Sequence, residues 1–216
     1  MKKYEVIIFD LDGVIINQSI AIMACAKHAL LKCGIVENDE KKLLRFIGPT
    51  IKDSFMRFYS FDEKKALEAI GYFREMYWKE GIYNYKVYEG INDSLSALKK
   101  RGKKIFVATT KPKKSADIIL KDANLYSFFY GIYGDTMTFD VTKTSMIRQI
   151  LKDNGITDNS QVVMIGDREG DINGAKDNNI DSIGVTYGFG TYEELKKAGA
   201  TYIVSDVKEL RELLEK

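Results

Sequence analysis

The chain has 216 residues, of which 45% are hydrophobic and 30% are charged, a composition that supports a buried core and excludes a disordered tail. Its 33 basic and 31 acidic residues give a formal charge of +2, so charge alone does not predict a nucleic acid or a membrane surface as partner. The lone histidine, His28, excludes a multi-histidine zinc site, and two cysteines exclude a disulfide-rich scaffold.

The N-terminal residues Met1-Lys2-Lys3 lack the length and the small-residue cleavage site of a signal peptide. No apolar run approaches the ~20 residues needed to cross a bilayer. We therefore expect a cytoplasmic protein without membrane contact, with Cys25 and Cys33 as free thiols.

Short runs of buried-strand character alternate with helical patterns through most of the chain. We expect strands over 4–9, 104–109, 131–134, 161–165, 182–186 and 201–204. We expect helices near 91–101, 112–123, 143–154, 170–178, 191–198 and 206–215. This alternation predicts an α/β fold, a doubly wound parallel sheet with helices on both faces.

The interval from Asn17 to about Tyr83 breaks this alternation, because it shows only helical periodicity, interrupted at Gly34, Gly48-Pro49 and Gly71. A crossover between parallel strands needs about a dozen residues, and this interval is several times longer. We therefore expect an inserted small helical domain over 17–83 and an α/β core formed by 1–16 and 84–216. The aromatic residues of the insert recur at helical spacing, and most of them are expected in its core.

Polar residues follow the strands expected at 4–9, 104–109 and 161–165, and one lysine opens the helix before the last of them. They are Asp10, Asp12, Thr109, Thr110, Lys111, Lys143, Asp167 and Asp171. Because ligands bind beyond the carboxyl ends of the strands in open α/β sheets, we expect these side chains to converge.

Four carboxylates at one sheet edge would repel one another, and a divalent cation would remove that repulsion. An all-oxygen site without histidine suits Mg²⁺, which completes its shell with water and substrate phosphate. The pattern therefore indicates phosphoryl chemistry. No Gly-x-x-x-x-Gly-Lys-Ser/Thr loop is present, so a P-loop nucleotidase is excluded.

The segment Phe9-Asp10-Leu11-Asp12-Gly13-Val14, Thr109, Lys143 and the Gly166-Asp167 pair with Asp171 resemble the four motifs of the haloacid dehalogenase-like (HAD) hydrolase superfamily, in the same order. Residues 166–190 are most similar to its phosphoglycolate phosphatase-like branch. That branch carries a helical cap between the first motif and the second strand, where this chain has its insert. The resemblance implies a Rossmann-like core with an inserted α-helical cap.

The resemblance also implies a phosphatase that hydrolyses small phosphomonoesters through an aspartyl-phosphate. Asp10 would attack phosphorus, and Asp12 would protonate the leaving oxygen and then deprotonate the attacking water. Thr109 and Lys143 would hold the phosphoryl oxygens, the first by a hydrogen bond and the second by charge.

A Mg²⁺ ion is implied as cofactor by the same resemblance. Asp10, the backbone carbonyl of Asp12 and Asp167 would bind it. Asp171 would lie behind these ligands and orient them.

Three positions depart from the family pattern. Asn17 stands where relatives usually have Asp, Thr110 replaces a common Asn, and Thr144-Ser145 follows Lys143 in place of the frequent Pro. No catalytic group is removed, but the substrate stays open among phosphoglycolate, a nucleoside monophosphate and a sugar phosphate. The partner expected is thus a small phosphorylated metabolite, and the sequence sets no oligomeric state.

The segment Gly48-Pro49-Thr50-Ile51-Lys52 resembles the substrate-specificity stretch of this branch. A phosphomutase is the second hypothesis. It is disfavoured because relatives that isomerise sugar phosphates place an Arg where this chain has Ile51. A phospho-accepting signalling receiver domain is the third, disfavoured by the position of Asp10 and by the insert. Arg45, Lys52 and Thr110 are the candidates for substrate contact.

Overall fold

Six parallel strands form the central sheet, in the order β5-β4-β1-β6-β7-β8. They are β1 (Val6–Phe9), β4 (Lys104–Pro112), β5 (Gly131–Asp135), β6 (Val162–Gly166), β7 (Asp181–Val185) and β8 (Tyr202–Val204). After β1 the chain adds β4 and β5 on one side and then β6, β7 and β8 on the other. This confirms the predicted doubly wound α/β fold and places its topological switch point at β1.

The computed structural model describes residues 3–136 and 141–215. It divides the chain into two units, one formed by the residues through Asn17 with those from Val87 onward, the other by Gln18–Lys86. The sequence pattern placed these divisions after residues 16 and 83. Two short strands, β2 (Ile16–Asn17) and β3 (Lys86–Val87), pair where the chain leaves and re-enters the first unit. The pattern did not predict them, because two residues carry no periodicity.

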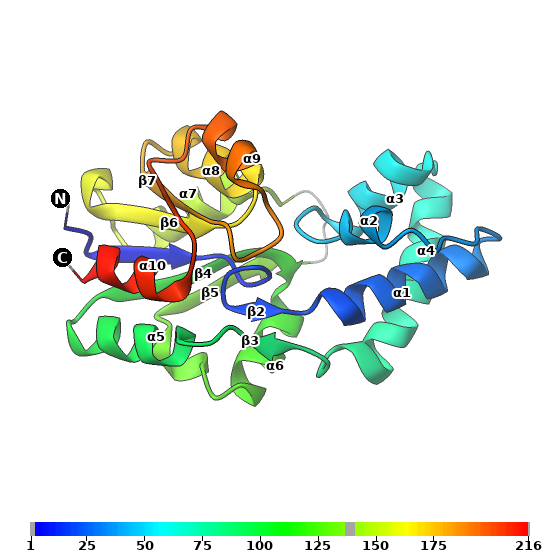
Figure 1. The fold of residues 1–216 in the computed structure, drawn as a ribbon, viewed down its shortest axis with the longest axis horizontal. Coiled ribbons are helices and arrows are strands. Elements are labelled where there is room, and N and C mark those ends of the chain that lie inside the picture. The colour runs from blue at the N-terminus through cyan, green and yellow to red at the C-terminus, as the bar shows by residue number, and fades with distance from the viewer. Residues whose placement is uncertain (1–2, 137–140, 216) are drawn as a thin grey trace. The chain divides into compact units, whose positions relative to one another are not determined.

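Helices cover both faces of the sheet. The α7 (Lys143–Asp153), α8 (Glu169–Asp177) and α9 (Tyr192–Ala198) helices lie on one face, and α5 (Ile91–Lys100) and α6 (Lys113–Asp122) lie on the other (Figure 1). The last helix, α10 (Val207–Leu214), packs beside α5. All six helices expected in this unit are present. The five that connect parallel strands lie on one face for the strands added on one side of β1 and on the other face for the rest, as crossovers of a single hand require.

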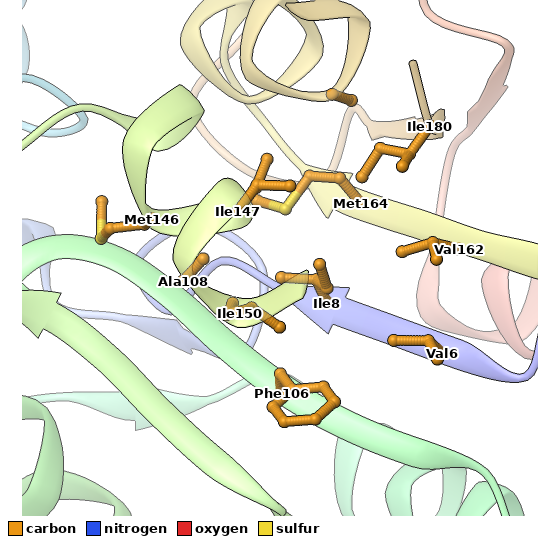
Figure 2. Packing of buried hydrophobic residues seen from close by; sticks show 11 residues of the cluster. Val6, Ile8, Phe106, Ala108, Met146, Ile147, Ile150, Val162, Met164 and Ile180 are labelled. Carbon is orange, nitrogen blue, oxygen red and sulfur yellow. The ribbon is translucent and has the colours of Figure 1, made fainter. Parts of the chain in front are cut away.

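The core between the sheet and α7 and α8 is built from alternate strand residues (Figure 2). Strands β1, β4 and β6 each send side chains to this face, and α7 sends a row at helical spacing. The labelled members are Val6, Ile8, Phe106, Ala108, Val162, Met164, Met146, Ile147, Ile150 and Ile180. The intervening Ile7 and Phe9 are also fully buried, so β1 is apolar throughout. Burial on both faces fixes the strand register and hence the position of the residues that follow β1.

The second unit is helical, with α1 (Ser19–Lys32), α2 (Glu40–Leu44), α3 (Ile51–Tyr59), α4 (Glu63–Met76) and a π-helical turn at Tyr77–Gly81. The side chains of Asp39, Thr50 and Asp62 cap α2, α3 and α4 by accepting backbone N–H groups. Gly34 and Gly48 fall between helices, as expected, and both have a positive φ.

One expected break is wrong, because α4 runs through Gly71 without interruption. A helical glycine costs about 1 kcal/mol relative to alanine. The buried stripe of Ala66, Ala69, Ile70 and Phe73 on the same helix offsets that cost.

Aromatic rings form the centre of this unit. Phe55 is fully buried, stacks on Phe61 at 5.7 Å and meets Phe46 edge-on at 5.0 Å. Phe73 and Tyr77 are buried as well, whereas Trp78 is 38% exposed. The expectation of a largely aromatic core holds for these rings and not for Trp78.

Replacing Phe55 with Ala should therefore destabilise the helical unit by about 3–5 kcal/mol, because it leaves a cavity among stacked rings. Trp78, the chain's single tryptophan, lies in this unit, so urea unfolding followed by its fluorescence reports the change. Leu67→Ala, at an exposed position of α4, is the control and should shift the transition little. Equal shifts in both variants would contradict the assignment of Phe55 to the centre of the core.

Candidate active site

Register brings the predicted site residues to one edge of the sheet. Phe9, the last residue of β1, lies opposite Val107 of β4 and Ile165 of β6. The next residues along these three strands therefore meet at the same edge. The structure brings Asp10, Asp167, Asp171 and Lys143 into direct proximity there.

Three of the carboxylates form one buried cluster. Asp10, Asp167 and Asp171 are 5%, 1% and 2% exposed, and each places one oxygen within 4.8 Å of the others. So close a group of anions is unfavourable unless positive charge balances it. One buried lysine, Lys143, supplies part of the positive charge that is needed.

Lys143 is the first residue of α7, which begins with a capping box between Thr142 and Ser145. Its Nζ lies 2.6 Å from Asp10 Oδ1 and 2.6 Å from Asp171 Oδ1, and it donates to the Ala108 carbonyl at 2.9 Å. The ammonium is therefore surrounded by three protein oxygens, one hydrogen-bonded carbonyl and two ion-paired carboxylates. To hold a phosphoryl oxygen, as the resemblance implies, Lys143 must exchange one of these partners for substrate.

The pKa values of the cluster reflect this crowding. The pKa of Asp10 is raised to about 7. Burial is the largest cause, Lys143 opposes it, and the charges of Asp171 and Asp12 add to it. Burial, together with Asp171 and Asp10, holds the pKa of Asp167 well above its usual range. Burial would lower the pKa of Lys143, but the two carboxylates beside it raise it, so this lysine is charged.

The donor atoms suit a hard divalent cation. Within the described part of the chain, the Oδ1 atoms of Asp12, Asp167 and Asp171 are buried and have no hydrogen-bond partner. Buried carboxylate oxygens without partners are costly, and they are the ligands that Mg²⁺ prefers. The residues present therefore fit the ion that the sequence pattern indicated.

Asp171 contacts both Lys143 and the backbone of the loop that follows β6. One of its oxygens faces Lys143, and the other accepts the backbone N–H of Arg168 at 3.1 Å. Its Oδ1 forms an ion pair with Lys143 but has no hydrogen-bond partner among the described residues, and the expected orienting role of Asp171 stays a prediction. Gly166 allows this approach, since a Cβ there would lie 2.1 Å from Asp171 Cβ.

Two glycines leave the room that the Asp167 carboxylate occupies. The sequence pattern did not predict this role for Gly188. A Cβ at Gly13 would lie 2.1 Å from Asp167 Oδ2, and one at Gly188 would lie 2.5 Å from the same oxygen. Gly13 also has a φ of 86°, in the left-handed region that favours glycine. The backbone N–H of Phe189 donates to Asp167 Oδ2 at 2.7 Å. The sequence signal that could have indicated this role is the Gly188-Phe189-Gly190 run. It is too short to match the Gly-x-Gly-x-x-Gly motif of dinucleotide-binding proteins.

Asp12 lies in the tight turn after β1, and its Oδ2 is 2.9 Å from Lys111 Nζ. The sequence pattern placed Lys111 at this sheet edge but gave it no role. Thr109 is 1% exposed, and its Oγ1 accepts the N–H of Lys111 at 3.2 Å, which leaves the hydroxyl proton available to donate. Thr110 is half-buried in β4 between them.

A pair of tyrosines beside the acidic cluster was also missed. The rings of Tyr88 and Tyr187 meet edge-on at 5.0 Å, and the Tyr187 hydroxyl donates to the Val14 carbonyl at 3.1 Å. Burial raises the pKa of Tyr88 to about 12, helped by the charges of Asp167 and Asp12. Both phenols are therefore neutral beside the carboxylates.

The candidates from the insert have local partners within the helical unit. The Arg45 guanidinium lies 3.8 Å from the centre of the Phe58 ring, and Lys52 forms an ion pair with Glu63 at 2.6 Å. These contacts account for their positions in this unit. Substrate contact by either remains a prediction.

A model of the family described as haloacid dehalogenase-like hydrolase matches residues 7–185. The chain belongs to this family. The superfamily expected from the motifs is thereby confirmed, and a signalling receiver domain is left without support. The match includes every motif residue from Asp10 to Asp171.

Known proteins resemble the chain over nearly its whole length. A 5′-nucleotidase of Pseudomonas aeruginosa is 38% identical over 99% of this chain and 96% of its own length. The crystal structure of a predicted phosphatase from Clostridium acetobutylicum superposes with a TM-score of 0.93 at 43% identity, covering 99% of this chain and 100% of that one. A phosphoglycolate phosphatase of Colwellia psychrerythraea is 26% identical over 97% of this chain and 96% of its own. Across residues 3–136 and 141–215, no helix combines the length and apolar character that crossing a membrane requires.

Replacing Gly188 with Ala should displace the Asp167 carboxylate and weaken Mg²⁺ binding about 10- to 100-fold, because the new Cβ would overlap it. Isothermal titration calorimetry with MgCl₂ measures the dissociation constant. Gly170→Ala is the matched control, since nothing lies within 4 Å of a Cβ there. Similar affinities in both variants would show that Asp167 does not hold the ion.

The raised pKa of Asp10 predicts how stability depends on pH in EDTA. The pKa of this carboxyl is about 7 in the folded chain, whereas its ordinary value of 3.8 applies in the unfolded chain. The folded state therefore holds more protons between these values, so the free energy of unfolding falls as pH rises from about 5 to 7.5. Urea unfolding across this interval measures the fall.

Asp10→Asn should flatten this decline, because its amide does not titrate. In the wild type, added Mg²⁺ should restore stability more at pH 8 than at pH 6, since the ion displaces the proton. Stability that rises between pH 5 and 7.5 in EDTA would contradict the prediction.

Proposed function

We propose that the chain is a Mg²⁺-dependent phosphatase that hydrolyses small phosphomonoesters through an aspartyl-phosphate on Asp10. The observation that carries the proposal is the buried set of Asp10, Asp167 and Lys143 at the switch point of the sheet. Membership of a hydrolase family and similarity to phosphatases support it. The rest of the proposal assigns each side chain a task.

Mg²⁺ would be held by Asp10, Asp167 and the backbone carbonyl of Asp12, and when bound it would neutralise charge between the nucleophile and the phosphoryl group. An Asp10 carboxylate oxygen forms a bond to phosphorus as the bond to the leaving oxygen breaks. Asp12 gives its proton to that oxygen, which departs as an alcohol. Asp12 then takes a proton from water, whose oxygen attacks phosphorus, releasing phosphate and restoring Asp10.

Thr109 and Lys143 complete the arrangement around the phosphoryl group. The Thr109 hydroxyl donates its free proton to one phosphoryl oxygen. Lys143 gives up one of its carboxylate partners for another phosphoryl oxygen as the negative charge of the substrate enters. Their contribution is electrostatic, directed to charge that develops as the transfer proceeds.

A nucleoside 5′-monophosphate is the substrate class that we propose first. The support is the 38% identity to a 5′-nucleotidase over nearly the whole chain. Phosphoglycolate comes second, on the weaker similarity to a phosphoglycolate phosphatase, and sugar phosphates third. The helical insert would act as the cap that selects among them, with Arg45, Lys52 and Thr110 as candidate contacts, in a cytoplasmic enzyme.

A phosphomutase remains the alternative within the superfamily. It would have to return the phosphoryl group of Asp10 to a second hydroxyl of the substrate and not to water. Ile51, at the start of α3, offers no charge for gripping a second phosphate. Hydrolysis is therefore favoured.

Phosphate release from a panel of esters, with Mg²⁺ and with EDTA, tests the proposal. Asp10→Asn should lower kcat by on the order of 10⁴-fold or more, because it removes the nucleophile. Asp181→Asn is the matched control, since Asp181 begins β7 and accepts the Tyr4 hydroxyl at the other end of the sheet. Metal-independent release, or normal release by Asp10→Asn, would refute the mechanism.

A further inference from the structure

Lys111 is a buried cation that the proposed chemistry does not use. Its Nζ lies 2.9 Å from Asp12 Oδ2, and the two side chains are 8% and 11% exposed. A charge pair so little exposed to water is held more firmly than one on the surface. The pair therefore constrains the group to which the mechanism assigns proton transfer.

The backbone of Asp12 is already fixed by the turn after β1. Gly13 N–H donates to the Ile16 carbonyl, and the N–H groups of Ile15 and Ile16 both donate to the Leu11 carbonyl. Only rotation of the Asp12 side chain remains free. Its Oδ1 has no hydrogen-bond partner among the described residues, so Lys111 is the contact that sets this rotation.

The direction of the Lys111 side chain is set by a shift in strand register at the end of β4. The pairing of β4 with β5 shifts register between Thr109 and Pro112, as at a β-bulge. Gly134 of β5 lets the strands approach there, since a Cβ on it would lie 2.7 Å from the Lys111 carbonyl. With its N–H bound to Thr109 Oγ1, Lys111 directs its side chain to Asp12.

We infer that Lys111 is a positioning residue that contacts Oδ2 of Asp12 and so holds its carboxyl group in the orientation needed for Oδ1 to carry a proton to the leaving oxygen. The inference rests on the proposed function and adds to it a residue for which no role was expected. A displacement of about 1 Å at a reacting group costs on the order of 10²-fold in rate. Loss of the ammonium should therefore slow the steps that need Asp12 and leave binding of the phosphoryl group intact.

Leaving-group dependence tests this role. In Lys111→Met, kcat for an alkyl phosphate such as β-glycerol phosphate should fall about 10- to 100-fold, because the alkoxide needs a proton to depart. The phenolate of p-nitrophenyl phosphate departs without a proton. For this ester, the single-turnover rate constant of Asp10 phosphorylation should therefore fall less than about threefold. KM should change little for either ester, and Lys111→Arg should recover most of the loss.

Two controls separate positioning from other roles. Lys113→Met removes a lysine close by on α6, exposed and paired with Asp117, and should leave both esters unaffected. In an Asp12→Asn background, Lys111→Met should cause little further loss, because both changes act through one group. Raised KM for both esters, or a full additional loss in that background, would mean that Lys111 grips the phosphoryl group directly and would overturn the inference.

A crystal structure of Lys111→Met gives a readout that does not depend on activity. The Asp12 side chain should adopt a different rotamer or several, while Asp10 and Asp167 stay in place. An unchanged Asp12 would overturn the inference even if the wild type released no phosphate from any ester. The absence of wild-type activity would instead refute the proposed function, so the two failures are distinguishable.

Discussion

The structure depends on keeping several carboxylates buried together at the carboxyl end of β1. Asp10, Asp167 and Asp171 share one site at exposures of 5% or less, where like charges repel strongly. The residues around the cluster either reduce that repulsion or fix the positions of the carboxylates. Lys143 bridges Asp10 and Asp171, and Lys111 pairs with Asp12. Gly13 and Gly188 leave room for the Asp167 carboxylate. A divalent cation bound between these carboxylates would reduce the repulsion that is left.

The sheet and the acidic cluster were predictable because they leave strong signals. Strands buried on both faces appear as continuous apolar runs, and the polar residues after them must meet at the same edge. Asp10, Asp167, Asp171 and Lys143 were found in this way. The fold of the helical insert was predictable only as a class, since periodicity alone does not set helix ends. Gly71 shows the limit, because a glycine ends a helix only where packing does not compensate.

The roles of Lys111 and Gly188 could not be predicted from the sequence, because each depends on a single contact that leaves no periodic pattern. Lys111 is one of 33 basic residues, and only a register shift in β4 directs it to Asp12. Gly188 matters because of a carboxylate that comes from a loop 21 positions earlier in the chain, at Asp167. Neither relation can be read from local sequence. Such contacts become visible only when distant segments are placed together.

The helical unit closes on itself where the chain enters and leaves it. Gln18, 1% exposed, donates from Nε2 to the carbonyls of Gly81 at 2.9 Å and Ile82 at 3.1 Å, and its Oε1 accepts the Tyr77 hydroxyl. A segment whose two ends are tied together behaves as a single long loop, and the entropy of closing such a loop grows only slowly with its length. The insert can therefore be lengthened, shortened or exchanged for another without disturbing the pairing of β1 with β4. In evolution this makes the helical unit a replaceable module, free to diverge while the acidic cluster stays under its own constraints.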